Sequence, residues 1–554
     1  MAEHVVSSWR PVAAVLISAA AIVLIVASYR RPNVRDAWSV LAAVGKFAVV
    51  ASMVPGVLDG TEYRWSLGMV PGLDSEFVFG IEFALRADPL GMLFALLASF
   101  LWIFTAFYSV GYMRGLDEPN QTRFFAAFAG SLSAAIGIAF AENLVTIFLF
   151  YELLSVATYP LVAHDETEEA RTAGRKYLAY TFFGGGFLVL AGTALVFVLT
   201  GTTTFGATAT ELANADPALA RAAFGLLAAG FGVKAALMPL HSWLPDAMAA
   251  PTPVSGLLHA VAVVKSGAFG VARVVLEVFE PDLVSDLGVG VILAAVAAFT
   301  LTVASVIALR QDRLKRRLAY STISQLSYIV LGLSILGETA TVGGLLHIPA
   351  HAFMKLTLFF CAGFIHVETH TDYISEMDGI GKRMPLTMVA FAVAAAGMAG
   401  IPLVAGFVSK WFILIGAVEA GGGQTVFAVV LLVSGVLNVA YFWPIVYGAF
   451  FESHDDADDK PLAEGPLGGR LAPSAADTRS EPVPDGGEPG AEGEDHGGPG
   501  EGGWERVGWT GGEGSWLMLG PILAIVAGAV VLGVVPYQAV FLELIDVIVE
   551  GVFS

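Results

Sequence analysis

Cysteine and charged residues are both scarce in this sequence of 554 residues, and each shortage excludes a class of protein. The single cysteine, Cys361, lies in an apolar run, which excludes a disulfide framework, a thiolate metal site and iron–sulfur ligation. Charged residues make up 14% of the chain, hydrophobic residues 56%, and the mean hydropathy is +0.72. No soluble domain of this length would tolerate such a composition. The sequence therefore predicts a polytopic membrane protein with no cofactor, no metal and no nucleic-acid partner.

Apolar segments long enough to cross about 30 Å of hydrocarbon recur along the whole chain. The first has no small-residue cleavage site after it and is followed by Arg30 and Arg31, which favours a spanning helix over a signal peptide. We expect an all-α polytopic fold with about fourteen transmembrane spans, numbered here in chain order: 11–29, 36–55, 88–110, 122–140, 142–162, 176–200, 218–238, 252–273, 284–309, 316–336, 341–365, 385–416, 424–450 and 515–535.

Loop charge predicts the orientation of these spans. The connections after odd-numbered spans hold fifteen Lys and Arg residues, whereas the opposite side holds only Arg10, Arg64, Arg86, Arg221 and Arg273. By the positive-inside rule, the ends of the odd-numbered spans are cytoplasmic and both termini are outside.

One long connection, residues 452–514, is rich in Gly and Pro and holds sixteen acidic residues against four basic ones. Such a segment cannot bury enough apolar surface to fold, so we expect a disordered cytoplasmic tether. An acidic loop could bind cations or a basic partner. The simpler interpretation is a solvated insertion in a protein from a halophile, which the pI near 4.9 also favours.

Five of the nine lysines lie inside predicted spans: Lys46, Lys234, Lys265, Lys355 and Lys410. Each would cost roughly 2.5–3.5 kcal/mol if it faced lipid unpaired, so we expect them to face protein, water or counter-charges. The twenty arginines all lie outside the expected helix centres. Arg stays protonated everywhere, whereas a desolvated Lys can exchange its proton near neutral pH. The pattern therefore indicates a proton path.

Spans five and seven hold the first candidate pair. Glu152 lies halfway along an apolar run, and a carboxylate at mid-membrane is a functional candidate by default; the alternative is a buried Glu that locks two helices together. Lys234 lies shortly before Pro239, where the loss of a backbone hydrogen bond should unwind the helix. Unwound backbone at membrane depth is tolerated only against protein or a water-filled cavity.

Spans eight and eleven add further titratable groups. His259 and Lys265 are six residues apart, so on a regular α-helix they should point to different sides and serve successive steps. His347, His351 and Lys355 are spaced four and four, which places them on one helix face. A lone buried His is usually a core residue, but three titratable groups in one stripe favour a proton wire.

Span twelve again pairs a proline break with a lysine, Pro402 followed by Lys410. Spans 4–8 and 9–13 could therefore form two inverted five-helix repeats, each with one broken helix (spans seven and twelve) and one central Lys. We divide the chain on this basis into residues 1–110 (spans 1–3), 111–275 (first repeat), 276–451 (second repeat), 452–514 (acidic loop) and 515–554 (span 14 and tail).

Several strings resemble the proton-conducting antiporter family, which includes subunits of Mrp-type sodium/proton antiporters, respiratory complex I and membrane-bound hydrogenases. They fall within about residues 88–450: Tyr-Glu-Leu-Leu-Ser at 151–155, Met-Pro-Leu-His-Ser-Trp-Leu-Pro-Asp-Ala at 238–247, Ala-Pro-Thr-Pro-Val-Ser-Gly-Leu-Leu-His at 250–259, Leu-Ala-Tyr-Ser-Thr-Ile-Ser-Gln at 318–325 and His-Ala-Phe-Met-Lys at 351–355. The strings at 108–113 and 174–180 look most like the Mrp D-type protein.

The resemblance implies roles by matching motif. Glu152 corresponds to the glutamate that pairs with the span-seven lysine, here Lys234. His259 and Lys265 correspond to the relay in span eight, and His351 and Lys355 to the relay in span eleven. Lys410 corresponds to the terminal lysine in span twelve. The resemblance also implies partner membrane subunits and transport of H⁺ and Na⁺. Lys46 matches no motif, and we expect it to snorkel or to pair with an acidic neighbour.

Three functions stay open at this point. The first is an Mrp-type antiporter subunit, favoured by the lysine in span twelve. We also expect neither the long lateral helix that marks the most distal complex I subunit nor the extra C-terminal helices of the Mrp A-type protein. The second is a proton-pumping subunit of a complex I-like or hydrogenase machine, and the third is a non-transporting scaffold, which five buried lysines disfavour.

Overall fold

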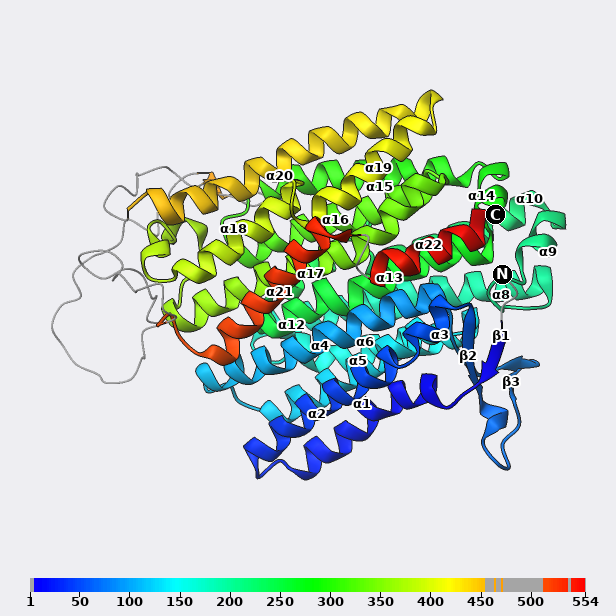
Figure 1. Cartoon of the computed structure of the whole chain (residues 1–554), viewed down its shortest axis with the longest axis horizontal. Helices are drawn as coiled ribbons and strands as arrows, with labels where there is room; N and C mark the ends of the chain where they lie inside the picture. Colours follow the sequence, from blue (N-terminus) through cyan, green and yellow to red (C-terminus); the bar gives the residue numbers. More distant parts are fainter. Residues whose placement is uncertain (1–3, 454–462, 465–469, 472–511, 537–539, 554) are drawn as a thin grey trace.

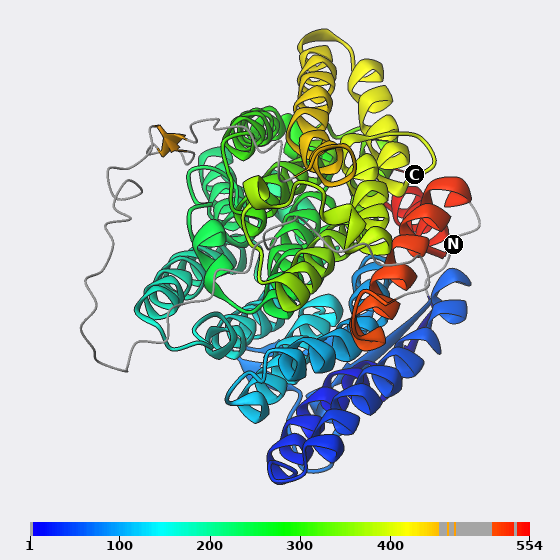
Figure 2. The same ribbon diagram turned by 90° about the vertical axis from the view of Figure 1, so that its left-hand side faces the viewer.

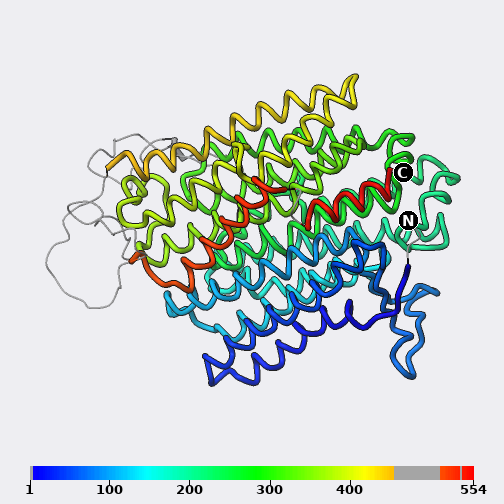
Figure 3. The backbone as a smooth tube through the Cα atoms, in the orientation of Figure 1, coloured from blue at the N-terminus to red at the C-terminus, as the bar shows by residue number. Residues whose placement is uncertain are grey.

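The computed structural model describes residues 4–453, 463–464, 470–471, 512–536 and 540–553. Most helices run along one direction and form a single bundle (Figures 1 and 3). Both chain ends lie at one end of this bundle, and helix α21 (Trp516–Val534) starts at the other (Figure 1). The expected helical fold is confirmed within the described residues. The acidic loop 452–514 falls almost wholly outside them, so its character stays a prediction.

The N-terminal helices form one edge of the bundle, and α20 lies at the opposite edge (Figure 2). Helix α1 packs against α2 and α5. A small β-structure, which the sequence analysis did not predict, lies at the end that holds the termini: β1 pairs parallel with β2, β2 antiparallel with β5, and β3 with β4. Strands this short show no clear alternating pattern. The elements are β1 (His4–Ser7), α1 (Arg10–Ala27), α2 (Pro32–Ala51), α3 (Val54–Leu58), β2 (Thr61–Ser66), η1 (Leu67–Met69), β3 (Glu76–Val78), β4 (Ile81–Glu82) and β5 (Ala84–Ala87).

The central helices begin with two capped starts. The Asp88 side chain accepts a hydrogen bond from the Gly91 N–H at the start of α4, and Asn143 caps α6 in the same way. The elements are α4 (Pro89–Gly115), α5 (Gln121–Phe140), α6 (Leu144–Val162), α7 (Glu168–Leu178), η2 (Ala179–Gly186), α8 (Phe187–Thr200), α9 (Ala209–Asn214), α10 (Pro217–Lys234), α11 (Trp243–Asp246), η3 (Ala247–Ala249), α12 (Thr252–Gly256), η4 (Leu257–Val261), α13 (Val263–Arg273) and η5 (Val274–Val278).

The remaining helices complete the bundle, and the tail after span fourteen is helical too. Helix α22 packs against α4 and α17. The elements are α14 (Pro281–Asp286), α15 (Val289–Ala308), α16 (Leu314–Ser334), α17 (Glu338–Thr369), η6 (Ile374–Glu376), η7 (Ile380–Lys382), α18 (Pro385–Ala399), α19 (Ala405–Glu419), η8 (Gly422–Gln424), α20 (Thr425–Phe451), β6 (Ala463–Glu464), β7 (Arg470–Leu471), α21 and α22 (Val540–Phe553).

Ten helices in the described part of the chain are long and apolar enough to cross a membrane, against the fourteen spans expected. The other four expected spans are seven, eight, ten and twelve. Span seven ends at Lys234, span eight is divided into short segments, span ten is rich in polar residues, and span twelve is divided between α18 and α19. The predicted breaks in spans seven and twelve are therefore present, whereas the two inverted repeats stay a prediction.

Arg273 differs from its expected place in a loop. Its side chain is 0% exposed. Arg273 is the last residue of α13, which continues directly into the π-helical segment η5. The guanidinium pairs with Asp88 at 2.6 Å and with Glu277 at 2.5 Å. Two carboxylates thus make its burial tolerable at the end of the bundle that holds the termini.

Candidate functional site

The five lysines expected to avoid lipid all lie in helices of the described structure. Lys46, Lys234, Lys265 and Lys355 are each 0% exposed, and Lys410 is partly buried. Protein therefore surrounds these side chains, as the cost of an unpaired charge in lipid requires.

Glu152 and Lys234 face each other across α6 and α10. The two charges interact electrostatically, but no ion pair within 4.0 Å joins them among the described residues. The Lys234 ammonium instead donates to the Tyr151 carbonyl at 2.5 Å and lies 3.3 Å from the centre of the Tyr151 ring. Glu152 Oε1 is buried without a hydrogen-bond partner, against Gly186 of η2. The expected pair is thus open in this structure, with Tyr151 holding the lysine.

The stretch that carries His259 and Lys265 is not a regular α-helix, so the premise of the predicted angle between the two side chains does not hold, and their division into successive steps stays a prediction. The π-helical segment η4 holds His259, and Ala262 breaks the helical geometry with φ −115° and ψ −72°. Both side chains are fully buried. Both ring nitrogens of His259 and the Lys265 ammonium are without a hydrogen-bond partner in the described structure.

The stripe on α17 lies as its spacing predicted. The rings of His347 and His351 are 6.1 Å apart, and Lys355 lies one turn further. His347 bridges two other helices: Nε2 hydrogen-bonds Gln325 at 2.9 Å and Nδ1 hydrogen-bonds Ser409 at 2.8 Å.

The middle of this stripe is electrostatically connected to α13. Both ring nitrogens of His351 are without partners in the described structure, while Lys265 and Lys355 both interact with this ring. The Lys355 ammonium donates to the Ser321 hydroxyl at 2.5 Å and to the Leu318 carbonyl at 3.0 Å. Lys265, His351 and Lys355 therefore form one connected cluster.

Lys410 lies on α19, directly after the break between α18 and α19. Its ammonium donates to the Met398 carbonyl at 2.5 Å and lies 4.6 Å from the centre of the Tyr328 ring. The Tyr328 and His347 rings are 5.5 Å apart. Lys410 is thus connected through Tyr328 and His347 to the α17 stripe.

The structure brings the predicted residues together as two groups: Glu152 with Lys234, and Lys265 with the histidines, Lys355 and Lys410. Helix packing joins the groups, since Gly267 of α13 lies directly against the backbone of Lys234. Sequence reasoning did not single out the residues that hold the lysines and His347, because hydroxyls, amides and carbonyls carry no charge signal. Tyr151, Ser321 and Tyr328 contact lysines, and Gln325 and Ser409 contact His347.

Lys46 neither snorkels nor pairs with an acid, so that expectation is wrong. Its ammonium donates to the Leu132 carbonyl at 2.9 Å and lies 4.7 Å from the Trp102 ring. A carbonyl and an aromatic face substitute for a counter-ion here. Lys46 lies between α2, α4 and α5, apart from the two groups described above.

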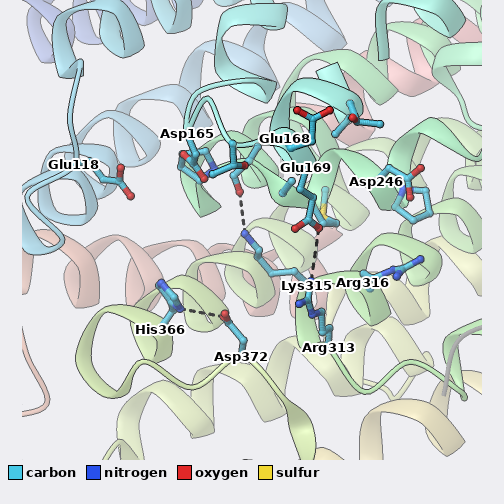
Figure 4. A pocket seen from close by; sticks show the side chains of 18 of the residues that line it. Glu118, Asp165, Glu168, Glu169, Asp246, Arg313, Lys315, Arg316, His366 and Asp372 are labelled. Atoms are coloured by element: carbon cyan, nitrogen blue, oxygen red, sulfur yellow. Dashed lines mark hydrogen bonds and ion pairs between the residues drawn. The ribbon is translucent and has the colours of Figure 1, made fainter. Parts of the chain in front are cut away.

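A cavity of about 740 Å³ opens among the loops that follow spans three, five, seven, nine and eleven. Figure 4 shows charged side chains from these loops around it, including Glu118, Asp165, Asp246, Arg313 and His366. The segment between the end of α10 and the start of α12 contributes part of its lining. The cavity thus lies at the arginine-rich end of the bundle and reaches Pro245 and Pro251, which follow the broken backbone beyond Lys234.

Two protein-family models match the sequence of this chain. The model described as NADH:quinone oxidoreductase/Mrp antiporter, TM, matches residues 141–436, and the model of the N-terminus of complex I chain 5 matches residues 77–125. The first match alone covers more than half of the chain. The chain belongs to this family of antiporter-like membrane subunits. Its multi-pass membrane character follows from the family and from the apolar helices.

Relatives come from both branches of the antiporter-like family. The N-type subunit of an NADH-quinone oxidoreductase from Desulforudis audaxviator is 34% identical over 68% of this chain and 74% of that protein. A probable K(+)/H(+) antiporter A/B-type subunit from Rhizobium meliloti is 33% identical over 73% of this chain but only 40% of that protein. The chain thus spans less than half of the longer relative.

Two solved structures share the fold along almost the whole chain. A chain of the Mrp complex from Dietzia sp. aligns with a TM-score of 0.77 and 22% identity, over 98% of both chains. A chain of the membrane-bound sulfane sulfur reductase, an archaeal respiratory membrane complex, aligns with a TM-score of 0.77 and 23% identity, over 99% of this chain and 100% of that one. At this identity the likeness concerns the fold.

Proposed function

We propose that the chain is the proton-translocating membrane subunit of a multisubunit monovalent cation (Na⁺)/H⁺ antiporter, similar to the Mrp D-type protein. One observation carries the proposal: five buried nitrogen atoms, on His259, Lys265 and His351, lie in one cluster without hydrogen-bond partners in the described structure. Each such atom costs about 1–3 kcal/mol. A cluster of this kind is stable only if water or exchanging protons reach it.

The first step of the relay belongs to Glu152 and Lys234. When the two charges approach, the carboxylate stabilises protonated Lys234. When they separate, as in this structure, the buried ammonium loses that counter-charge and its proton is released more readily. Tyr151 holds the ammonium in the separated arrangement through its carbonyl and its ring.

The proton then passes from Lys234 to Lys265, and onward through His351 and Lys355 towards Lys410. The step between the first two lysines needs a bridging water, since they lie in separate groups. From the cluster, the His347 ring and Tyr328 lead to Lys410. His259 lies beside Lys355, with which it interacts electrostatically.

The cavity among the arginine-rich loops is the proposed entrance. If these loops are cytoplasmic, as the positive-inside rule indicates, protons enter from the cytoplasm and both termini lie outside. The partners are other membrane subunits, because the relatives and structural neighbours are subunits of larger assemblies. No cage of several carboxylates suited to Na⁺ was found in the sequence, so Na⁺ is expected to move through partners.

A complex I-like or hydrogenase-type proton pump is the second candidate. The match to the NADH-quinone oxidoreductase subunit from Desulforudis audaxviator covers 74% of that protein, which favours this alternative. The same lysines would serve it, with redox energy from partner subunits in place of a sodium gradient. Vesicles that acidify in response to a quinone-linked donor, and not to Na⁺, would decide for this alternative.

The relay is tested by Glu152→Ala and Lys234→Ala in the assembled complex, with sodium-dependent pH change in vesicles as the assay. Both variants should assemble and lose ion-coupled proton transport. Lys46→Met is the matched control, because it also removes a fully buried membrane lysine but lies outside the proposed relay. Wild-type transport in either relay variant would refute the assignment.

A further inference from the structure

Two carboxylates that line the cavity in Figure 4, Glu118 and Asp165, lie close to a buried histidine, away from the lysines of the proposed relay. Glu118 follows α4, and His164 and Asp165 follow α6. One ligand atom from each side chain lies within 4.8 Å of the other two, and His164 Nε2 is 4.0 Å from Glu118 Oε2. Figure 4 shows Glu118 and Asp165 on the same side of the cavity, opposite His366 and Asp372.

The histidine of this group is buried without a hydrogen bond to its ring. His164 is 1% exposed, and in the described structure neither ring nitrogen has a hydrogen-bond partner. The Pro119 carbonyl interacts with the ring but does not complete a hydrogen bond. Buried polar atoms are nearly always paired in proteins, so an unpaired imidazole that faces two carboxylates indicates a missing ligand.

The surroundings hold the imidazole in place. The ring packs edge-on against Phe124, with ring centres 5.5 Å apart, and Arg123 donates to the His164 carbonyl at 2.8 Å. Desolvation lowers the pKa of His164.

The loop that carries Glu118 is also fixed before any ligand binds. The Glu118 N–H donates to the Met113 carbonyl at 3.0 Å, and the Gln121 side chain donates to the Glu118 carbonyl at 3.0 Å. No Lys or Arg lies within 4.0 Å of the Glu118 or Asp165 carboxylates in the described structure. Lys315 interacts with both carboxylates only at longer range, so both oxygens can still bind a cation.

We propose that Glu118, His164 and Asp165 form a binding site for a borderline divalent cation, of which Zn²⁺ is the representative. One imidazole nitrogen and two carboxylate oxygens match the ligands that Zn²⁺ accepts, whereas Ca²⁺ prefers six to eight oxygens and Mg²⁺ a nearly complete octahedron. Zn²⁺ bonds of about 2.0–2.2 Å place two ligand atoms roughly 3.3 Å apart. The present separations, 4.0 Å for one pair and at most 4.8 Å, require a contraction of roughly 0.7–1.5 Å. The exposed Asp165 and the half-buried Glu118 can supply it by side-chain rotation.

The test measures Zn²⁺ binding to the purified full-length chain with a competing chelator. We expect one tight site per chain, weakened at least tenfold by His164→Ala and by Glu118→Gln. Glu169→Gln is the matched control: it removes a carboxylate from the same cavity, but from α7 and outside the three-residue group. Its affinity should equal that of the wild type.

Two further measurements keep the result unambiguous. X-ray absorption at the zinc edge should show an imidazole nitrogen among the ligands, and this signal should disappear in His164→Ala. Zn²⁺ should raise the Tm of the wild type and of Glu169→Gln but not that of Glu118→Gln, which also serves if His164→Ala fails to fold. Wild-type affinity in Glu118→Gln, equal weakening in Glu169→Gln, or coordination by oxygen alone would each overturn the proposal.

Discussion

The position of Glu152 can be tested without removing its carboxylate, through Gly186→Ala. Gly186 has helical angles, φ −62° and ψ −43°, so an alanine fits the backbone. A methyl group at this position would lie 2.5 Å from the Glu152 carboxyl carbon and 2.8 Å from Oε2. Non-bonded carbon atoms prefer about 3.5–4.0 Å, so the carboxyl group must move by about 1 Å or more.

The expected stability change is small, while the expected functional change is large. Gly→Ala inside a helix gains about 1 kcal/mol, and forcing a side chain off its rotamer costs about 0.5–1.5 kcal/mol. The two effects nearly cancel, so the complex should assemble. A reacting group displaced by about 1 Å can lose on the order of 10²-fold in rate, so we expect proton transport in proteoliposomes to fall roughly 10- to 100-fold.

Gly184→Ala is the control for this substitution. It lies two residues earlier in the same π-helical segment, gains the same helix propensity, and its added methyl group meets only the Ala179 carbonyl, at an ordinary 3.4 Å. Its transport rate should match the wild type. If Gly186→Ala transports as fast as Gly184→Ala, the position of the Glu152 carboxylate does not matter for proton transfer.

Three further outcomes are expected. Lys410→Arg should assemble but lose proton transfer in pH-jump assays, because Arg keeps the charge and cannot release its proton. A wild-type rate would show that the proton does not pass through Lys410 and that the relay ends at His351 and Lys355. Arg273→Ala should destabilise the protein by about 3–5 kcal/mol in thermal unfolding, because the buried Asp88 keeps only the more distant Arg86 and the partly exposed Glu277 loses its ion pair. Arg221→Ala, which loses a bond to the Leu287 carbonyl, should cost about 1 kcal/mol, and equal losses in the two variants would contradict this account. Deleting residues 456–510 should leave transport largely intact, because their composition predicts a solvated tether, and loss of activity in an assembled deletion variant would show a binding role.

Local features of the sequence were sufficient for much of this fold. The breaks after Lys234 and before Lys410 were predicted from Pro239 and Pro402, and both are present. A proline alone does not decide this, because α6 and α17 continue through Pro160 and Pro349. The stripe on α17 was likewise predictable, since a spacing of four residues places side chains on one face of any regular helix.

Other features depend on packing between distant segments. The π-helical turn at His259 lies where Gly256 packs closely against Leu356 and Phe360, so its geometry depends on α17, about a hundred residues further along the chain. The partner of Lys46 is a backbone carbonyl at Leu132, a group that every residue carries and that no sequence pattern marks.

The sequence by itself determined that titratable lysines lie inside the membrane helices, because five of them stand within apolar runs long enough to span the membrane. Only the tertiary structure decided which of them form one cluster, that Tyr151 rather than Glu152 holds Lys234, and that Glu118 meets His164 at the cavity wall. The physical reason is how far apart along the chain the residues lie that determine each feature. The face of a helix on which a residue lies follows from neighbours along the chain, whereas the distance between two charges depends on how separate helices pack.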